Sequence, residues 1–143
     1  MKLISFIVLC TLAAAVKGAI SKEAVETVRT LSNECLKEIG ATDAVFDEMI
    51  KNLPATNMEV KCLRACLMKK VNVLTPDGKL NKENALKMAE MHTEGDAEKM
   101  KIAHAVADAC EAISIPDDHC EAAEAYKMCI LSEAKKHGVN GLI

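Results

Sequence analysis

Apolar residues recur every three or four positions along most of the chain, which is the spacing of one helical face. The first such pattern lies between Ser21, which suits an N-cap, and Gly40, which suits a C-terminal stop. It predicts a helix over this stretch. The apolar face of that helix is formed by Val25, Val28, Leu31, Cys35 and Ile39.

Two more helices are predicted before the middle of the chain. The second begins near Asp43 and ends before Pro54, because the residue before a proline is disfavoured in helical geometry. The third begins at Thr56, which forms a capping-box pattern with Glu59. This third helix carries two cysteines four positions apart, next to its apolar residues.

Turn residues separate the third helix from the patterns that follow. The segment LTPDGKLN has the composition of a turn. After it, Asn81 suits the N-cap of a fourth helix that reaches about Thr93. Asp96 suits the N-cap of a fifth helix that reaches about Ile113.

A sixth helix is predicted to have Pro116 in its first turn and to continue to about Lys136. Alternation of the kind that marks strands is absent, and β-branched residues are sparse. Ala, Glu, Lys, Met and Leu dominate instead, and these are good helix formers. The chain is therefore predicted to be an all-α protein with six helices.

The first 18 residues have the layout of a secretory signal peptide. Lys2 precedes an apolar run from Leu3 to Val16, and cleavage after Gly18 fits the preference for small residues. The mature protein would then be one domain, residues 19–143. No other stretch reaches the roughly 18 uninterrupted apolar residues that a membrane helix needs. We therefore expect a secreted, extracellular protein with no stable membrane association.

Charge and length limit the classes of partner and fold that the chain could have. The chain has 18 basic and 21 acidic residues, and two of the basic ones, Lys2 and Lys17, leave with the signal. A chain with an acidic balance is a poor match for phosphate backbones, so no nucleic-acid partner is expected. The remaining length, about 125 residues, is enough to bury a core without covalent staples.

Six cysteines remain in the mature chain, because Cys10 leaves with the signal. An even number in an exported chain predicts a disulfide framework and leaves no free thiol for nucleophilic catalysis. Cys62 and Cys66 would project side by side from one face of a helix, so they cannot form a disulfide with each other. Cys120 and Cys129 would project from opposite faces of a helix, so they cannot form one either. Ten of the fifteen possible connectivities of six cysteines stay open.

The gaps between these cysteines are distinctive. Three residues lie between Cys62 and Cys66 and eight between Cys120 and Cys129, and the gaps after Cys35 and Cys66 are long. Together with the signal peptide, the length and the helices, this spacing resembles the insect odorant-binding proteins, the pheromone and general odorant-binding family. The resemblance covers the whole mature chain. It implies the bridges Cys35–Cys66, Cys62–Cys120 and Cys110–Cys129.

The resemblance also implies a fold and a function. The fold is a six-helix, disulfide-braced bundle that encloses an apolar cavity. The function is that of a carrier, which binds small hydrophobic ligands such as odorants or pheromones non-covalently and moves them through an aqueous secretion. Each bridge contributes roughly 2–4 kcal/mol, and we interpret the three as bracing around a hollow centre. Ordinary robustness of an extracellular protein is the alternative interpretation.

The composition of the predicted helices suggests what such a cavity would bind. Phe46 and Tyr126 are the aromatic residues of the mature chain, and methionine is frequent, a side chain that repacks around guests of different shape. We therefore expect a preference for flexible aliphatic or modestly polar ligands, although any single methionine can equally be core filler. The candidate ligand-binding residues are Val28, Leu31, Phe46, Met49, Leu53, Leu67, Leu86, Met100, Val106, Ala107, Tyr126 and Ile130.

A further implication of the resemblance is ligand release on a change of pH, which requires a titrating group. His92 is the candidate switch, because it shares a helical face with Ala85, Leu86 and Ala89. A satisfied core histidine is the alternative. His119, in the first turn of the sixth helix, is expected to be an ordinary surface residue.

Other function classes fit less well. The chain has no G-x-S-x-G and no H-E-x-x-H motif, so we expect no enzymatic activity, no cofactor and no metal. A secreted lipid-active helical protein of the saposin type would begin with a closely spaced cysteine pair, which this chain lacks. A non-olfactory carrier of hydrophobic metabolites remains an alternative within the same fold. The sequence leaves a weak homodimer open.

Overall fold

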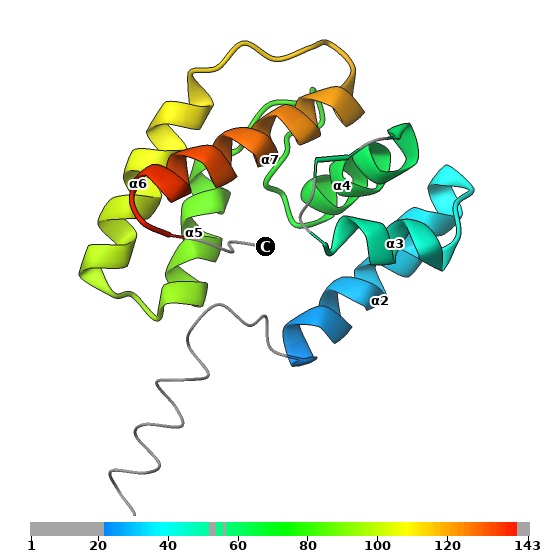
Figure 1. Cartoon of the computed structure of the whole chain (residues 1–143), viewed down its shortest axis with the longest axis horizontal. Helices are drawn as coiled ribbons and strands as arrows, with labels where there is room; N and C mark the ends of the chain where they lie inside the picture. The colour runs from blue at the N-terminus through cyan, green and yellow to red at the C-terminus, as the bar shows by residue number, and fades with distance from the viewer. Residues whose placement is uncertain (1–21, 52–53, 56, 140–143) are drawn as a thin grey trace, which may run out of the picture.

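The computed structural model describes residues 22–51, 54–55 and 57–139, apart from the side chains of residues 23–25. Within these residues the chain forms six α-helices and one isolated antiparallel bridge, between Leu74 and Leu80 (Figure 1). The predicted all-α fold is thus confirmed. The helices are α2 (Lys22–Ile39), α3 (Asp43–Met49), α4 (Met58–Lys70), α5 (Lys82–Thr93), α6 (Ala97–Glu111) and α7 (His119–Lys136).

Two of the predicted helix starts are confirmed. The Asn81 side chain accepts a hydrogen bond from the amide of Asn84 at 3.2 Å, and α5 follows it. The Asp96 side chain accepts one from the amide of Lys99 at 2.9 Å, and α6 follows it. Each cap satisfies an amide that has no partner within its own helix.

Two other helix starts were predicted wrongly. The N-cap of α4 is Asn57, which accepts from the amide of Val60 at 3.0 Å, whereas the expected cap Thr56 lies outside the described residues. The N-cap of α7 is Asp118, so Pro116 precedes the helix and is not in its first turn. In both places an Asn or Asp reaches the third helical amide, and such residues are stronger caps than Thr.

The helices pack in an order that differs from their order in the sequence. Helix α4 lies in the middle, with α2 and α3 on one side and α7 on the other (Figure 1). Helix α6 then packs on α7, and α5 on α6. Among the described helices, α2 and α3 have no backbone contact with α5, α6 or α7. Two halves of the molecule therefore meet through α4.

Each half has its own apolar cluster of buried side chains. In the first half, Phe46, Leu63, Cys35 and Val60 are fully buried, and Val45 is buried beside them. In the second half the cluster contains Leu74, Leu80, Val106, Cys110, Ala123 and Tyr126. The sequence-based prediction of one set of inward faces therefore corresponds to two separate clusters.

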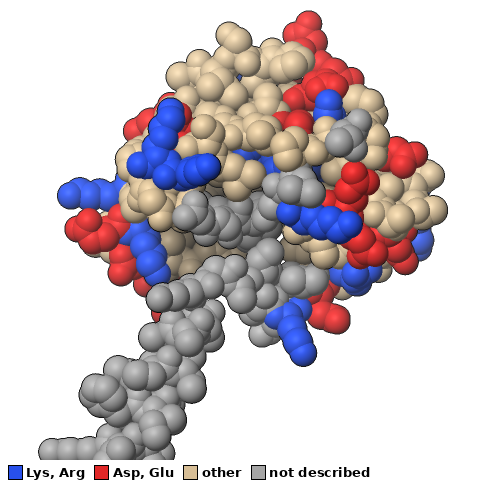
Figure 2. Space-filling view, viewed as in Figure 1, with Lys and Arg blue, Asp and Glu red and all other residues tan. Residues whose placement is uncertain are grey.

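The surface carries charges of both signs. Figure 2 shows lysine and arginine side chains on the same face as aspartate and glutamate side chains, with uncharged residues between them. Such a mixture gives no extended basic field on this face that would attract a polyanion. None of the helices within the described residues is long and apolar enough to cross a membrane.

Candidate functional site

Three disulfides connect four of the helices. Cys35–Cys66 ties α2 to α4, Cys62–Cys120 ties α4 to α7, and Cys110–Cys129 ties α6 to α7. The structure therefore has the pairing that the family resemblance implies. The bridges follow the order in which the helices pack, so the same contacts that join the two halves are also held covalently.

The twelve candidate ligand-binding residues do not form one group. Val28, Phe46, Met49 and Leu67 belong to the cluster of the first half, and Val106, Tyr126 and Ile130 to that of the second half. The remaining described candidates belong to neither cluster. Of these, Leu31, Leu86 and Met100 are half-buried and Ala107 is buried, while Leu53 lies outside the described residues.

The half-buried members are the ones that bear on a ligand site. Leu31 is on α2 and Leu86 is on α5, two helices that have no backbone contact with each other. Each of these leucines keeps part of its apolar surface exposed, outside both packed clusters. Partly exposed apolar surface of this kind is what an apolar ligand would cover.

Two of the histidines, His92 and His119, do not lie where the sequence suggested. His92 is exposed near the C-terminal end of α5, so the interpretation as a core histidine is wrong. No residue of α5 is buried, although Ala85, which shares the face with His92, packs against the cluster of the second half. The pH-switch role of His92 stays a prediction, and its exposure does not favour it. His119, which was expected to be an ordinary surface residue, is half-buried and lies 2.6 Å through Nδ1 from Lys69 Nζ.

A buried group of charges joins α4 to α7, and sequence reasoning missed it. Arg64, Glu124 and Lys127 are only 9%, 8% and 5% exposed. Arg64 Nε lies 3.5 Å from Glu124 Oε2, and Lys127 Nζ lies 3.6 Å from Glu124 Oε1. Glu124 Oε1 also accepts a hydrogen bond from the amide of Ala55 at 3.0 Å. The carboxylate of Glu124 therefore contacts a cation on α4, a cation on α7 and the backbone of the segment that enters α4.

Burying these three charged side chains has a free-energy cost, because each loses contact with water. Burial lowers the pKa of Arg64, and the charge of Glu124 opposes that shift. Burial and, after it, the charge of Arg64 lower the pKa of Lys127, again against the attraction of Glu124. Arg64 Nε and Glu124 Oε2 make no hydrogen bond within the described residues. Glu124 is thus the residue on which the group depends, because both cations face it.

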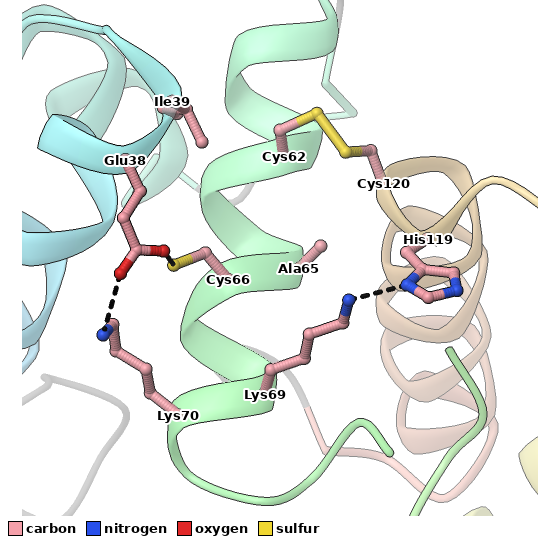
Figure 3. Close-up of a pocket in the computed structure, with 9 residues that line it drawn as sticks. All are labelled: Glu38, Ile39, Cys62, Ala65, Cys66, Lys69, Lys70, His119 and Cys120. Atoms are coloured by element: carbon pink, nitrogen blue, oxygen red, sulfur yellow. Dashed lines mark hydrogen bonds and ion pairs between the residues drawn. A yellow bond between two sulfur atoms is a disulfide. The ribbon is translucent and has the colours of Figure 1, made fainter. Parts of the chain in front are cut away.

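A groove of about 440 Å³ lies over one face of α4 (Figure 3). Its floor is a stripe of α4 side chains at helical spacing: Cys62, Ala65, Cys66, Lys69 and Lys70. One wall is the end of α2, with Glu38 and Ile39, and the other is the start of α7, with His119 and Cys120. We call this space the α4 groove. None of the twelve candidate ligand-binding residues lines it.

The two cysteines on α4 are the sequence signal that could have indicated this groove. Because Cys62 and Cys66 project from one face, their bridges hold α7 and α2 on either side of that face. Sequence reasoning predicted that this helix is stapled to two neighbours, and the structure confirms it. The sequence did not show that space stays open between the two staples.

A buried glycine fixes the His119 ring at the edge of the groove. Gly78 has φ +81°, and a Cβ built on it would lie 2.6 Å from His119 Cδ2. The ring therefore packs directly against the backbone of the turn between Leu74 and Leu80. On its other side Nδ1 meets Lys69. The position of the imidazole is thus set from two directions.

This packing predicts a difference between two glycine substitutions. Gly78→Ala should lower the free energy of unfolding by about 2–4 kcal/mol, because it combines a left-handed backbone with a steric clash. Gly95→Ala is the matched control, since Gly95 has φ +73° but nothing lies within 4 Å of its added Cβ. We expect about 1 kcal/mol there. Urea denaturation measures both values, and equal losses would contradict the packing of His119 on Gly78.

The donor set of the described residues does not suggest a metal centre. No group of three or more His, Cys, Asp or Glu side chains lies close enough to hold a metal ion within these residues. The six cysteines that could have served as ligands are all in disulfides. The apolar surfaces and the α4 groove are therefore the features that a functional assignment must explain.

Comparison with known proteins shows which family the chain resembles. The model of the PBP/GOBP family matches residues 17–133. General odorant-binding protein 28a of Drosophila melanogaster is 47% identical over 127 residues, which cover 89% of each chain. General odorant-binding protein 19d of the same species is 44% identical over 109 residues, covering 76% of this chain and 73% of that protein.

A solved structure agrees with the sequence relatives. The structure of odorant-binding protein 28a from Drosophila melanogaster matches with a TM-score of 0.71 and 49% identity, over 82% of this chain and 97% of that one. Both the family model and the relatives extend over most of the helical region described above. The chain therefore belongs to the PBP/GOBP family of insect odorant-binding proteins.

Proposed function

We propose that this protein is an extracellular carrier that binds small hydrophobic ligands non-covalently between its two halves. The observation that carries the proposal is the half-buried apolar surface of Leu31 and Leu86, on helices that do not contact each other. The relatives named above are odorant-binding proteins, which supports the same function. Residues 1–18 would be removed as a secretory signal, and they lie outside the described residues.

The chemistry proposed for the site is simple. The half-buried candidates Leu31, Leu86 and Met100 carry no aromatic ring, so ligands would be held by apolar contact and not by stacking. Among the described residues no hydrogen bond to the Tyr126 hydroxyl is found, and a ligand carbonyl or alcohol could supply one. No covalent step is required, and no turnover of the ligand is expected.

Fluorescent displacement tests the proposal. The mature, oxidised protein is saturated with N-phenyl-1-naphthylamine, a fluorescent apolar probe, and decanol is added as competitor. The proposal predicts saturable probe binding and displacement of the probe by decanol with no chemical change in the alcohol. Absence of saturable probe binding would contradict it. Leakage of lipid vesicles or hydrolysis of an ester would favour the two classes set aside above.

One substitution tests where the ligand lies. Leu86→Gln should weaken binding of the probe about tenfold, which corresponds to about 1.4 kcal/mol, because a polar amide replaces apolar contact surface. Met91→Gln is the matched control on the same helix, since Met91 is 71% exposed and we expect no more than about a twofold change there. The same fluorescence titration measures both, and equal affinities would exclude α5 from the site.

A further inference from the structure

The α4 groove shares no residue with the candidate residues of the proposed carrier site. Its residues come from the end of α2, one face of α4 and the start of α7, and no candidate ligand-binding residue is among them. Its volume of about 440 Å³ falls in the range of small-molecule sites. The centre of its floor is apolar, formed by Ala65 and the disulfide sulfurs, with Ile39 on one wall (Figure 3).

The two lysines of the groove differ in their partners. Lys70 Nζ lies 3.0 Å from Glu34 Oε2 and 3.4 Å from Glu38 Oε1, and these carboxylates raise the pKa of Lys70. Lys69 has no carboxylate of the described residues within 4 Å, and its partner is the His119 imidazole. The charge of Lys70 is therefore paired with carboxylates, whereas Lys69 makes no ion pair with a described carboxylate, although Asp77 interacts electrostatically with its partner His119.

Chemistry determines which group donates in the hydrogen bond between Lys69 and His119. An ammonium group has only donors, so Lys69 Nζ donates and His119 Nδ1 accepts, which leaves the imidazole proton on Nε2. This uses one of the three ammonium protons and keeps the other two available. Because Gly78 holds the ring in place, the ammonium is held at the edge of the groove before any ligand arrives.

We propose that the α4 groove is a second ligand site, which binds a short-chain amphipathic carboxylate. The carboxylate accepts hydrogen bonds from Lys69 Nζ, and the alkyl chain lies on Ala65 and the Cys62–Cys120 bridge. Glu38, on the opposite wall, is paired with Lys70, so it lies at the end away from Lys69. An anion is expected at the Lys69 end because Lys69 is the groove lysine without an ion pair among the described residues, whereas Lys70 is paired with Glu34 and Glu38.

Nuclear magnetic resonance of the mature, oxidised, ¹⁵N-labelled protein tests this site. The probes are octanoate, octanol and octylammonium, three ligands with the same chain and different head groups. We expect octanoate to shift the amide signals of residues 65–70 and 119–120 in a saturable manner. Octanol and octylammonium should leave these signals within about a tenth of the octanoate shift. Equal shifts with all three probes, or no shift with octanoate, would overturn the proposal.

A pair of substitutions tests the residue that recognises the head group. Lys69→Met removes the charge and leaves an unbranched side chain that is one atom shorter. It should weaken octanoate binding, measured at these amide signals, at least tenfold. Lys87→Met is the matched control, because it removes the same charge from an exposed ion pair on α5. Equal affinities of the two variants would overturn the role of Lys69. The comparison of head groups uses the natural chain, so it remains decisive if Lys69→Met does not fold.

The two sites can fail independently. Displacement of N-phenyl-1-naphthylamine by octanol reports the carrier site, and the amide signals of the α4 groove report the second site. Loss of octanoate shifts with displacement intact would overturn only the groove, and loss of displacement with the shifts intact would overturn only the carrier site.

Discussion

Glu124→Gln is expected to lower the free energy of unfolding by about 3–5 kcal/mol. Glutamine has the size of glutamate, and its amide oxygen can still accept from the amide of Ala55. What the substitution removes is the negative charge that faces both Arg64 and Lys127 inside the protein. Two cations, each at least nine-tenths buried, then lose the carboxylate they share. Urea denaturation of the oxidised protein measures the loss.

The matched control is Glu83→Gln, the same chemical change in an exposed ion pair. Glu83 Oε1 lies 2.8 Å from Lys87 Nζ on the surface of α5. Exposed pairs of this kind are screened by water, so we expect the free energy of unfolding to stay close to that of the natural protein. If Glu124→Gln also cost less than about 0.5 kcal/mol, water would have to reach the charged group in solution, and the burial argued above would be wrong.

Glu124 also shows what the sequence could not reveal. The segment from Glu121 to Lys127 has acidic and basic residues at the spacing of a solvated helical face. Two neighbours, Ala122 and Ala123, are fully buried and let α4 approach closely, which brings Arg64 against Glu124. The partner that buries these charges is 60 positions away in the chain. A local pattern carries no information about such a contact.

The helices themselves could be predicted well because their signals are local. Apolar spacing and the caps Asn81 and Asp96 act within a few residues, and the structure agrees with them. The errors occurred where several capping residues stand close together, before α4 and before α7. There the cap is decided by which side chain reaches the third amide, and Asn57 and Asp118 do so.

The candidate site could be predicted only in part. The spacing showed which residues of each helix face inward, but not that those faces would pack into two clusters on either side of α4. The cysteine pair on α4 indicated two staples from one face, which the structure has. His119 was misjudged because the turn that covers its ring, at Gly78, lies 41 positions earlier in the chain.

The disulfides allow stability and ligand binding to be separated. Removing the bridge between α4 and α7, with Cys62→Ala and Cys120→Ala, should lower the free energy of unfolding by about 4 kcal/mol, since its cysteines are 58 positions apart. Removing the bridge between α6 and α7, with Cys110→Ala and Cys129→Ala, should cost about 3 kcal/mol, for a separation of 19. Urea denaturation without reductant measures both losses.

Ligand affinity should distinguish these two variants more clearly than stability does. The bridge between α4 and α7 holds the two halves at their junction, whereas the bridge between α6 and α7 lies within one half. Loosening the junction lets the halves leave the arrangement that binds ligand. If a tenth of the molecules keep that arrangement, the apparent affinity falls about tenfold.

The variant that lacks Cys110–Cys129 should stay within about threefold of the natural protein, since its junction is still braced. Titration with N-phenyl-1-naphthylamine measures the two affinities in buffer without urea, where both variants are folded. Equal affinities would mean that the bridges contribute stability alone, and that the proposed carrier site does not depend on them.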